Sequence, residues 1–133
     1  MPVYTATDQL YSSLQQLFSR IELTDPQAMT TVQKSKLHVR FQTTQPAGIV
    51  VVNARQRPLA ITYGVNGRKP DVDIQLQADT LHQILLGELS IPKALGRRAL
   101  VASGPIWKTT ALNGILNQAR QLYPQVLQDQ GLR

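Results

Sequence analysis

The sequence predicts an α+β fold in which helices gather on one face of a five-stranded, largely antiparallel sheet. Residues 8–23 and 105–123 carry apolar side chains at helical spacing. Four segments between residues 36 and 77 instead alternate apolar and polar side chains or form short apolar runs, as strands do, and residues 98–103 fit a fifth strand. Strands that follow one another without intervening helices favour an α+β sheet over an alternating α/β fold.

The first helix is expected over residues 8–23, with Thr7 or Asp8 capping its first backbone N–H groups. Its apolar stripe consists of Leu10, Leu14, Leu17, Phe18 and Ile21. Thr24, Asp25 and Pro26 then end this helix and begin a short second one. In that helix Asp25 is the expected N-cap and Pro26 the first helical residue.

Four strands are expected next, over residues 36–43, 49–54, 59–65 and 71–77. In the first, Leu37, Val39 and Phe41 face the core, which places His38 on the solvent side. The connections are short, and Asn66-Gly67 marks a turn before the fourth strand. Such tight connections predict an antiparallel meander.

The C-terminal half is expected to contain three further helical segments. Asp79 caps a helix that runs to about Leu86, and Gly87 ends it. A short helical turn follows from Pro92 to Leu95, closed by Gly96, and leads to the strand at 98–103. The last helix is expected over 105–123 and should end or kink at Pro124, because the residue before a proline avoids helical geometry.

Length and composition indicate a single domain spanning residues 1–133, with 42% hydrophobic residues and no bulk disorder. The absence of cysteine removes disulfides, thiolate metal sites and cysteine nucleophiles, and it favours a reducing compartment. No apolar run approaches the roughly 20 residues that span a bilayer. The N-terminus also lacks the basic-then-apolar order of a secretory signal. We therefore expect a cytoplasmic protein.

The net charge of +6 could indicate an anionic partner, but the basic residues are dispersed and form no tract. Aromatic residues make up only 5% of the chain, which is few for stacking on bases. A solvated basic surface is therefore the favoured interpretation, and no nucleic-acid partner is expected.

No arrangement of residues makes a positive case for catalysis. His38 and His82 are far apart in the sequence, with no carboxylate at a metal-ligand spacing, so both are interpreted as surface histidines and no metal or cofactor is expected. Asp71 and Asp73 share one strand face, which a solvated strand edge explains better than a carboxylate pair. The common nucleophile and phosphate-loop motifs are missing. The sequence thus predicts a protein that is not an enzyme.

A more specific pattern covers residues 71–116. An acidic and apolar strand from Pro70 to Leu76 precedes a helix that closes with Leu85-Leu86-Gly87-Glu88-Leu89, followed by a proline-bearing turn. The next strand ends in Ser103-Gly104 and leads into the long C-terminal helix. This run resembles the sterol carrier protein family, and the spacing from Leu89 to Gly104 fits the family without a gap. The preceding elements fit in order, so the resemblance covers nearly the whole chain.

Two positions depart from the family pattern. The family usually has glycine where Arg98 stands, and Gly96 could provide the turn instead. Ala102 stands where a larger aliphatic residue is typical. Both changes could reshape the floor of the cavity that the family implies.

The resemblance implies an apolar tunnel between sheet and helices that binds a fatty acid, acyl-CoA or sterol-like lipid without catalysis, and that could transfer it. The residues it implies as lining are Ile106, Trp107, Ala111, Leu112, Ile115 and Leu116 on the last helix, Leu81, Leu85 and Leu86 on the middle helix, and Phe18 on the first. Core packing accounts equally well for any one of them, so the prediction rests on the group.

Two alternatives stay open. The domain could be an accessory or dimerisation module of the same fold, forming a homodimer, or, less favoured, it could bind nucleic acid through its basic surface. Arg97 and Arg98 are interpreted as a charged turn at the margin of the cavity. They could meet a lipid head group or make transient contact with an anionic membrane, although solvated turn residues are the safer interpretation.

Overall fold

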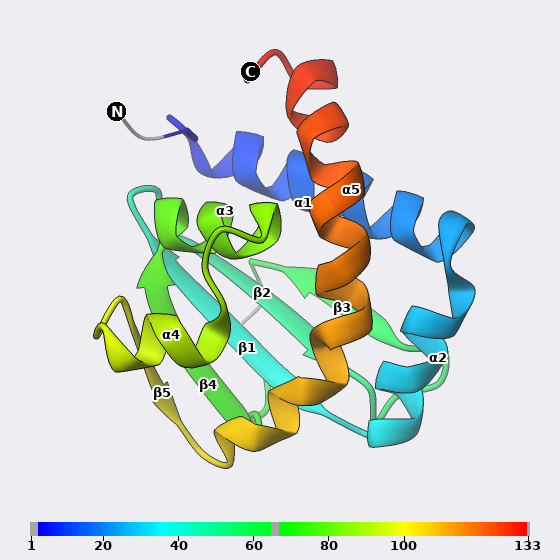
Figure 1. Ribbon diagram of the computed structural model, residues 1–133. Helices are drawn as coiled ribbons and strands as arrows, with labels where there is room; N and C mark the ends of the chain where they lie inside the picture. The colour runs from blue at the N-terminus through cyan, green and yellow to red at the C-terminus, as the bar shows by residue number, and fades with distance from the viewer. Residues whose placement is uncertain (1–2, 65–66, 133) are drawn as a thin grey trace.

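The computed structural model describes residues 3–64 and 67–132, so the predicted strand end at Val65 and turn residue Asn66 lie outside the described residues. The helices and strands along the chain are α1 (Thr7–Thr24), α2 (Pro26–Ser35), β1 (His38–Thr44), β2 (Gly48–Asn53), β3 (Ala60–Tyr63), β4 (Val72–Gln77), α3 (Ala78–Leu86), α4 (Ile91–Gly96), β5 (Leu100–Ser103), the 3-10 helix η1 (Ile106–Leu112) and α5 (Asn113–Asp129). The predicted α+β class and five-stranded sheet are confirmed (Figure 1).

The sheet has the order β3-β2-β1-β4-β5. The pairs β1–β2, β2–β3 and β4–β5 are antiparallel, as predicted, whereas β1 and β4 are parallel. The predicted meander is therefore correct up to β3 and wrong at β4. The reason is that the segment after β3 returns to the starting end of β1 before β4 begins, and there the backbone N–H of Asp71 donates to the carbonyl of His38 at 2.8 Å.

The inner face of the sheet is apolar and is covered by α1, α3 and α5 (Figure 1). Alternation along each strand sends every second side chain to this face. The buried strand residues on it are Val39, Val50, Val52, Val72, Ile74, Leu76 and Leu100. The helices contribute the other half of the core, mainly Leu10, Leu14, Leu17, Ile21, Leu81, Leu85, Ile115 and Tyr123. The stripe predicted for residues 8–23 is thus the buried face of α1, with Phe18 partly buried at its edge.

The outer face carries the polar strand side chains, and here one expectation was wrong. His38 is only 5% exposed rather than solvated, and it borders a hollow on this face together with Gly67 and Arg68 from the segment after β3. Next to it, Arg40 donates two hydrogen bonds to Asp73, from Nε at 3.1 Å and Nη2 at 2.5 Å, and Gln42 donates to the same carboxylate. Asp73 is therefore the centre of a side-chain network rather than part of a solvated edge, and its pKa lies below the usual range because Arg40 hydrogen-bonds to it.

The burial of His38 predicts a pH dependence of stability. Desolvation lowers the pKa of His38, Arg55 and Arg40 lower it further, and Asp71 opposes them. In the unfolded chain His38 titrates near the ordinary pKa of about 6.5. Below that pH the unfolded chain therefore binds more protons at His38 than the native state does. The contribution of His38 is thus fully present above about pH 6.5 and is lost as the pH falls through the native pKa.

We expect His38→Gln to remove this part of the acid sensitivity. The measurement is the free energy of unfolding by urea at about pH 7.5 and about pH 5, for both proteins. The decrease between the two pH values should be smaller in the variant. An equal decrease in both would show that His38 titrates in the native state as it does in the unfolded chain.

The predicted last helix differs in both its start and its end. Residues 106–112 form the 3-10 helix η1, and the α-helix begins only at Asn113. It then continues past Pro124 to Asp129. A proline inside a helix removes one backbone hydrogen bond, but Tyr123, Val126 and Leu127 are all buried on the inner side of this segment. Packing of the apolar face therefore outweighs the local preference of the residue before proline.

Two of the predicted helix ends are correct, but side chains predicted to cap helices make other hydrogen bonds. Gly87 has φ +79° and ends α3, as predicted, and Asp25 is the N-cap position of α2. However, the side chains expected to cap point elsewhere, since Thr7 donates to the carbonyl of Ala47 at 2.5 Å, and Asp79 accepts from the backbone N–H of Val3 at 3.0 Å. The N-cap residues of α1 and α3 are Ala6 and Gln77. These polar groups serve long-range contacts instead of local caps.

Candidate functional site

A small apolar cavity, here called the seam, lies between the inner face of the sheet and helices α1, α3 and α5. The residues that line it are Leu14, Phe18, Phe41, Val50, Val52, Leu81, Ile84, Leu85, Ile91, Leu112, Ile115 and Leu116. Every lining side chain is a hydrocarbon. The cavity measures about 40 Å³, whereas one water molecule needs roughly 10–15 Å³. The seam as it stands is therefore much too small for an acyl chain.

The seam brings together six of the ten residues expected to line a tunnel. These are Phe18, Leu81, Leu85, Leu112, Ile115 and Leu116. Leu86, Ile106 and Ala111 are partly buried against the core but do not line the seam, and Trp107 is 71% exposed. Ile106, Trp107 and Ala111 lie in the 3-10 helix. Its three residues per turn point their side chains in other directions than the predicted α-helix would.

Sequence reasoning missed the other six lining residues: Leu14, Phe41, Val50, Val52, Ile84 and Ile91. Leu14 and Phe41 were assigned to the inward side of their helix and strand, but not to a cavity. Nothing in the alternation distinguishes an inward residue beside a cavity from one that is packed on all sides. Ile91 is a different case, because it is the first residue of α4 and is held there by the Ser90 cap, whose hydroxyl accepts from the backbone N–H of Lys93.

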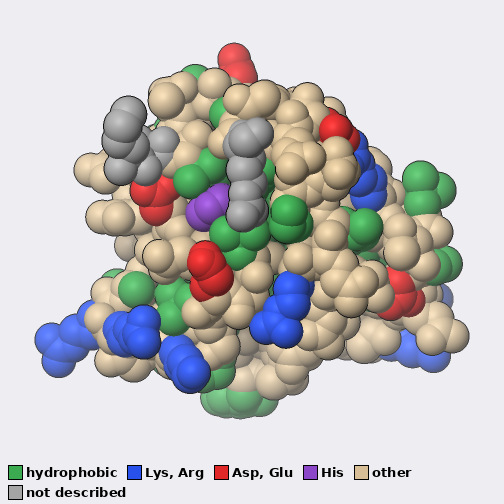
Figure 2. Space-filling model, turned by 45° about the horizontal axis from the view of Figure 1, so that its top comes forward, with side chains coloured by type: hydrophobic (Ala, Val, Ile, Leu, Met, Phe, Trp, Pro, Cys, Tyr) green, Lys and Arg blue, Asp and Glu red, His purple; other side chains and the backbone are tan. Residues whose placement is uncertain are grey.

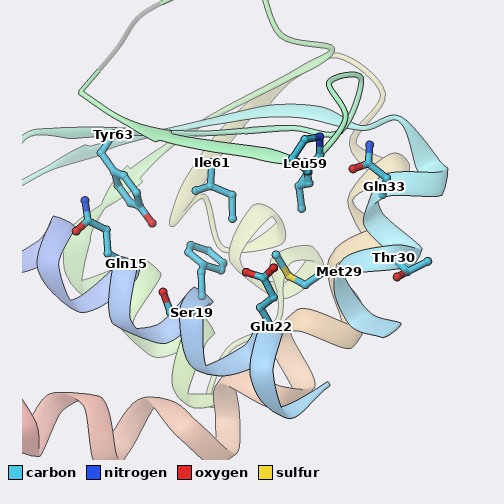
Figure 3. A pocket seen from close by; sticks show the side chains of 11 residues that line it. Gln15, Ser19, Glu22, Met29, Thr30, Gln33, Leu59, Ile61 and Tyr63 are labelled. Atoms are coloured by element: carbon cyan, nitrogen blue, oxygen red, sulfur yellow. The ribbon is translucent and has the colours of Figure 1, made fainter. Parts of the chain in front are cut away.

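Two open clefts flank the seam. The first, here called the α2 cleft, has a volume of about 550 Å³ and lies between α1, α2 and the edge strand β3 (Figure 3). Gln15, Ser19 and Glu22 reach it from α1, and Leu59, Ile61 and Tyr63 face them from β3 and the segment before it (Figure 3). Its remaining lining residues are Phe18, Met29, Thr30, Gln33 and Pro58. This cleft therefore has an apolar wall on the sheet side and a largely polar rim on the helical side.

The second, here called the α4 cleft, has a volume of about 330 Å³ and lies where the end of α3, the start of α4, η1 and α5 meet. Its lining residues are Ile84, Gly87, Leu89, Ser90, Ile91, Pro92, Thr109, Thr110, Asn113, Leu116, Asn117 and Arg120. It shares no lining residue with the α2 cleft.

Shared side chains connect both clefts to the seam. Phe18 lines the seam and the α2 cleft, while Ile84, Ile91 and Leu116 line the seam and the α4 cleft. The seam and the two clefts are therefore three adjoining spaces that meet at these four side chains.

The described residues also contain a buried polar cluster away from the seam. The hydroxyl of Tyr123 hydrogen-bonds to that of Tyr4 and lies 2.8 Å from Nδ1 of His82. His82 is therefore not the solvated histidine that the sequence suggested. Burial raises the pKa of both tyrosines well above the ordinary value. Neither hydroxyl ionises near neutral pH, so we interpret the cluster as the tie that fastens the N-terminal segment to α3 and α5.

Comparison with known families decides the affiliation of the chain. The sequence pattern that describes the SCP-2 sterol transfer family matches residues 14–117. The chain belongs to the SCP-2 sterol transfer family. The resemblance noted in the sequence is thereby confirmed, and membership in the SCP-2 family supports lipid binding in general. The matched residues contain all five strands of the sheet and all twelve residues that line the seam, which run from Leu14 to Leu116.

Solved structures of SCP-2 proteins share the fold. The sterol carrier protein domain 2 of Helicoverpa armigera is 20% identical, with a TM-score of 0.65 over 85% of this chain and 89% of that one. The apo sterol carrier protein 2 of Yarrowia lipolytica is 19% identical, with a TM-score of 0.59 over 76% of this chain and 85% of that one. No curated protein sequence matches significantly.

The fold also occurs inside a larger enzyme. The sec-alkylsulfatase Pisa1 from Pseudomonas sp. is 20% identical, with a TM-score of 0.57 over 65% of this chain. The aligned part is only 14% of the sulfatase chain, so this SCP-2 chain spans about a seventh of that protein. At this level of identity the likeness shows the fold alone.

The structure accounts for one departure from the SCP-2 pattern. Arg98, where the family usually has glycine, itself adopts the left-handed conformation with φ +60°. Gly96 does not provide this turn, because it is the last residue of α4. Arg97 and Arg98 are both exposed, and within the described part of the chain neither lines the seam or its two clefts.

Proposed function

We propose that this SCP-2 domain binds a single-chain lipid in the seam, with the chain extending into one or both flanking clefts, and that it does so without catalysis. The observation that carries the proposal is the seam itself. It is lined only by hydrocarbon side chains and shares four of them with the open clefts on either side. Six of the residues involved are those that the family resemblance implied, namely Phe18, Leu81, Leu85, Leu112, Ile115 and Leu116.

Energetic considerations are consistent with this proposal. Burying a methylene group contributes about 0.8 kcal/mol, so a chain of eight or more could supply micromolar affinity after the costs of association. Because the seam measures only about 40 Å³, part of this gain must offset the separation of the helices from the sheet. The bound form is then an opened state, and its affinity is reduced by the cost of opening.

The purely hydrocarbon lining of the seam supports a lipid carrier rather than an enzyme. No acid, base or nucleophile is among the described residues that line it. On the face shown in Figure 2, several basic side chains lie near one another along the lower left edge, and the other basic side chains lie apart. A surface that binds nucleic acid is nevertheless the less favoured alternative, because aromatic residues, on which bases could stack, make up only 5% of the chain.

The test is to extract lipids from the purified protein and identify them by mass spectrometry. The lipid-free protein is then titrated with a fluorescent fatty acid. We expect lipids to co-purify in a near-stoichiometric amount and to displace the probe in a saturable way. Neither co-purifying lipid nor saturable probe binding would contradict the proposal.

A further inference from the structure

We propose that Arg120 binds the carboxylate of a free fatty acid in the α4 cleft, with the alkyl chain running through the seam toward Phe18. This inference rests on the proposed function and adds to it the ligand class and the direction of the bound chain. It depends on how charge is distributed along the passage, on the placement of Arg120, and on the polar side chains around it.

The two clefts differ in charge. Among the described residues that line the α4 cleft, Arg120 is the only charged one, and Glu22 is the only charged one in the α2 cleft. The seam between them has no charged lining residue. An anionic head group is therefore attracted to the α4 cleft and repelled from the α2 cleft, whereas an uncharged head group has no such preference.

The guanidinium of Arg120 contacts the backbone at the end of α3, at the rim of the α4 cleft. Nη2 of Arg120 donates to the carbonyl of Gly87 at 3.2 Å. A Cβ atom on residue 87 would lie 2.2 Å from Nε of Arg120, so a larger residue there would displace the guanidinium from its present position. Gly87 thus both ends α3, as its φ of +79° requires, and makes room for the cation.

The polar edge of α5 adds further donors beside this cation. Asn113, Asn117 and Arg120 follow one another at the i, i+4, i+7 spacing of one helix face, and all three line the α4 cleft. Leu116 lies between them in sequence and lines both the cleft and the seam. A carboxylate at Arg120 can accept from the guanidinium and from side-chain amides, while its alkyl chain passes Leu116 into the seam.

A comparison of two ligands tests the inference. The affinities of tetradecanoic acid and tetradecanol, which share one chain length, are measured by displacement of a fluorescent lipid near neutral pH and low salt. We expect the acid to bind about fivefold more tightly than the alcohol, a modest factor because Arg120 is exposed to solvent. In Arg120→Gln the acid should lose this advantage, while the affinity for the alcohol stays unchanged.

Arg97→Gln is the matched control, because Arg97 is exposed and lines neither cleft nor seam. It should leave the ratio of the two affinities as in the wild type. Equal binding of acid and alcohol by the wild type, or an unchanged ratio in Arg120→Gln, would overturn the role of Arg120 while lipid binding stands. If neither ligand binds the wild type, the proposed function itself fails.

Discussion

Gly104→Ala is expected to lower the free energy of unfolding by about 3 kcal/mol. Gly104 has φ +92°, a conformation that disfavours any residue with a Cβ atom. A Cβ atom there would also lie 2.0 Å from the carbonyl oxygen of Asp71, a backbone atom directly before β4. The clash cannot be relieved by rotating a side chain, so β5 and η1 must move away from β4.

Urea denaturation at neutral pH measures this effect. Gly96→Ala is the matched control, because a Cβ atom at residue 96 meets nothing within 4 Å and its φ lies outside the left-handed range. The control should change the free energy of unfolding by less than about 0.5 kcal/mol. Similar effects of the two substitutions on the free energy of unfolding would show that the close approach of Gly104 to the carbonyl of Asp71 is not required for stability.

Most of the fold was predictable because its elements carry strong local patterns. Leu10, Leu14 and Leu17 define α1 by their spacing, and Val72, Ile74 and Leu76 define β4 by their alternation. The parallel pairing of β4 with β1 was not predictable in the same way. Alternation specifies which face of a strand is buried, but it does not specify which strand lies beside it or in which direction.

The C-terminal helical segment, which carries much of the site, shows a second limit of prediction from the sequence. The apolar stripe from Ile106 to Tyr123 predicted one α-helix, whereas tertiary packing makes its first seven residues a 3-10 helix and continues the α-helix past Pro124. The change in period moved Ile106, Trp107 and Ala111 out of the seam. Burial was also underestimated for His38, which is 5% exposed, because alternation along a strand does not show which distant segments lie beside its polar face.

Leu116→Trp is expected to weaken lipid binding about tenfold or more. Leu116 lies on α5 at the boundary between the α4 cleft and the seam, so a larger side chain there occupies the passage. The residue is only partly buried, and the indole can extend toward the cleft without forcing the core apart. The free energy of unfolding should therefore change by less than about 1 kcal/mol.

Leu122→Trp provides the matched control for the central claim that a lipid chain occupies the seam. Leu122 is also a partly buried leucine on α5 that packs against the core, but it lines neither the seam nor its two clefts. The deciding measurement is the equilibrium affinity of one fluorescent fatty acid for the wild type and for these two folded variants. Our account predicts a loss of about tenfold or more in Leu116→Trp alone. Equal affinities in all three proteins would contradict it.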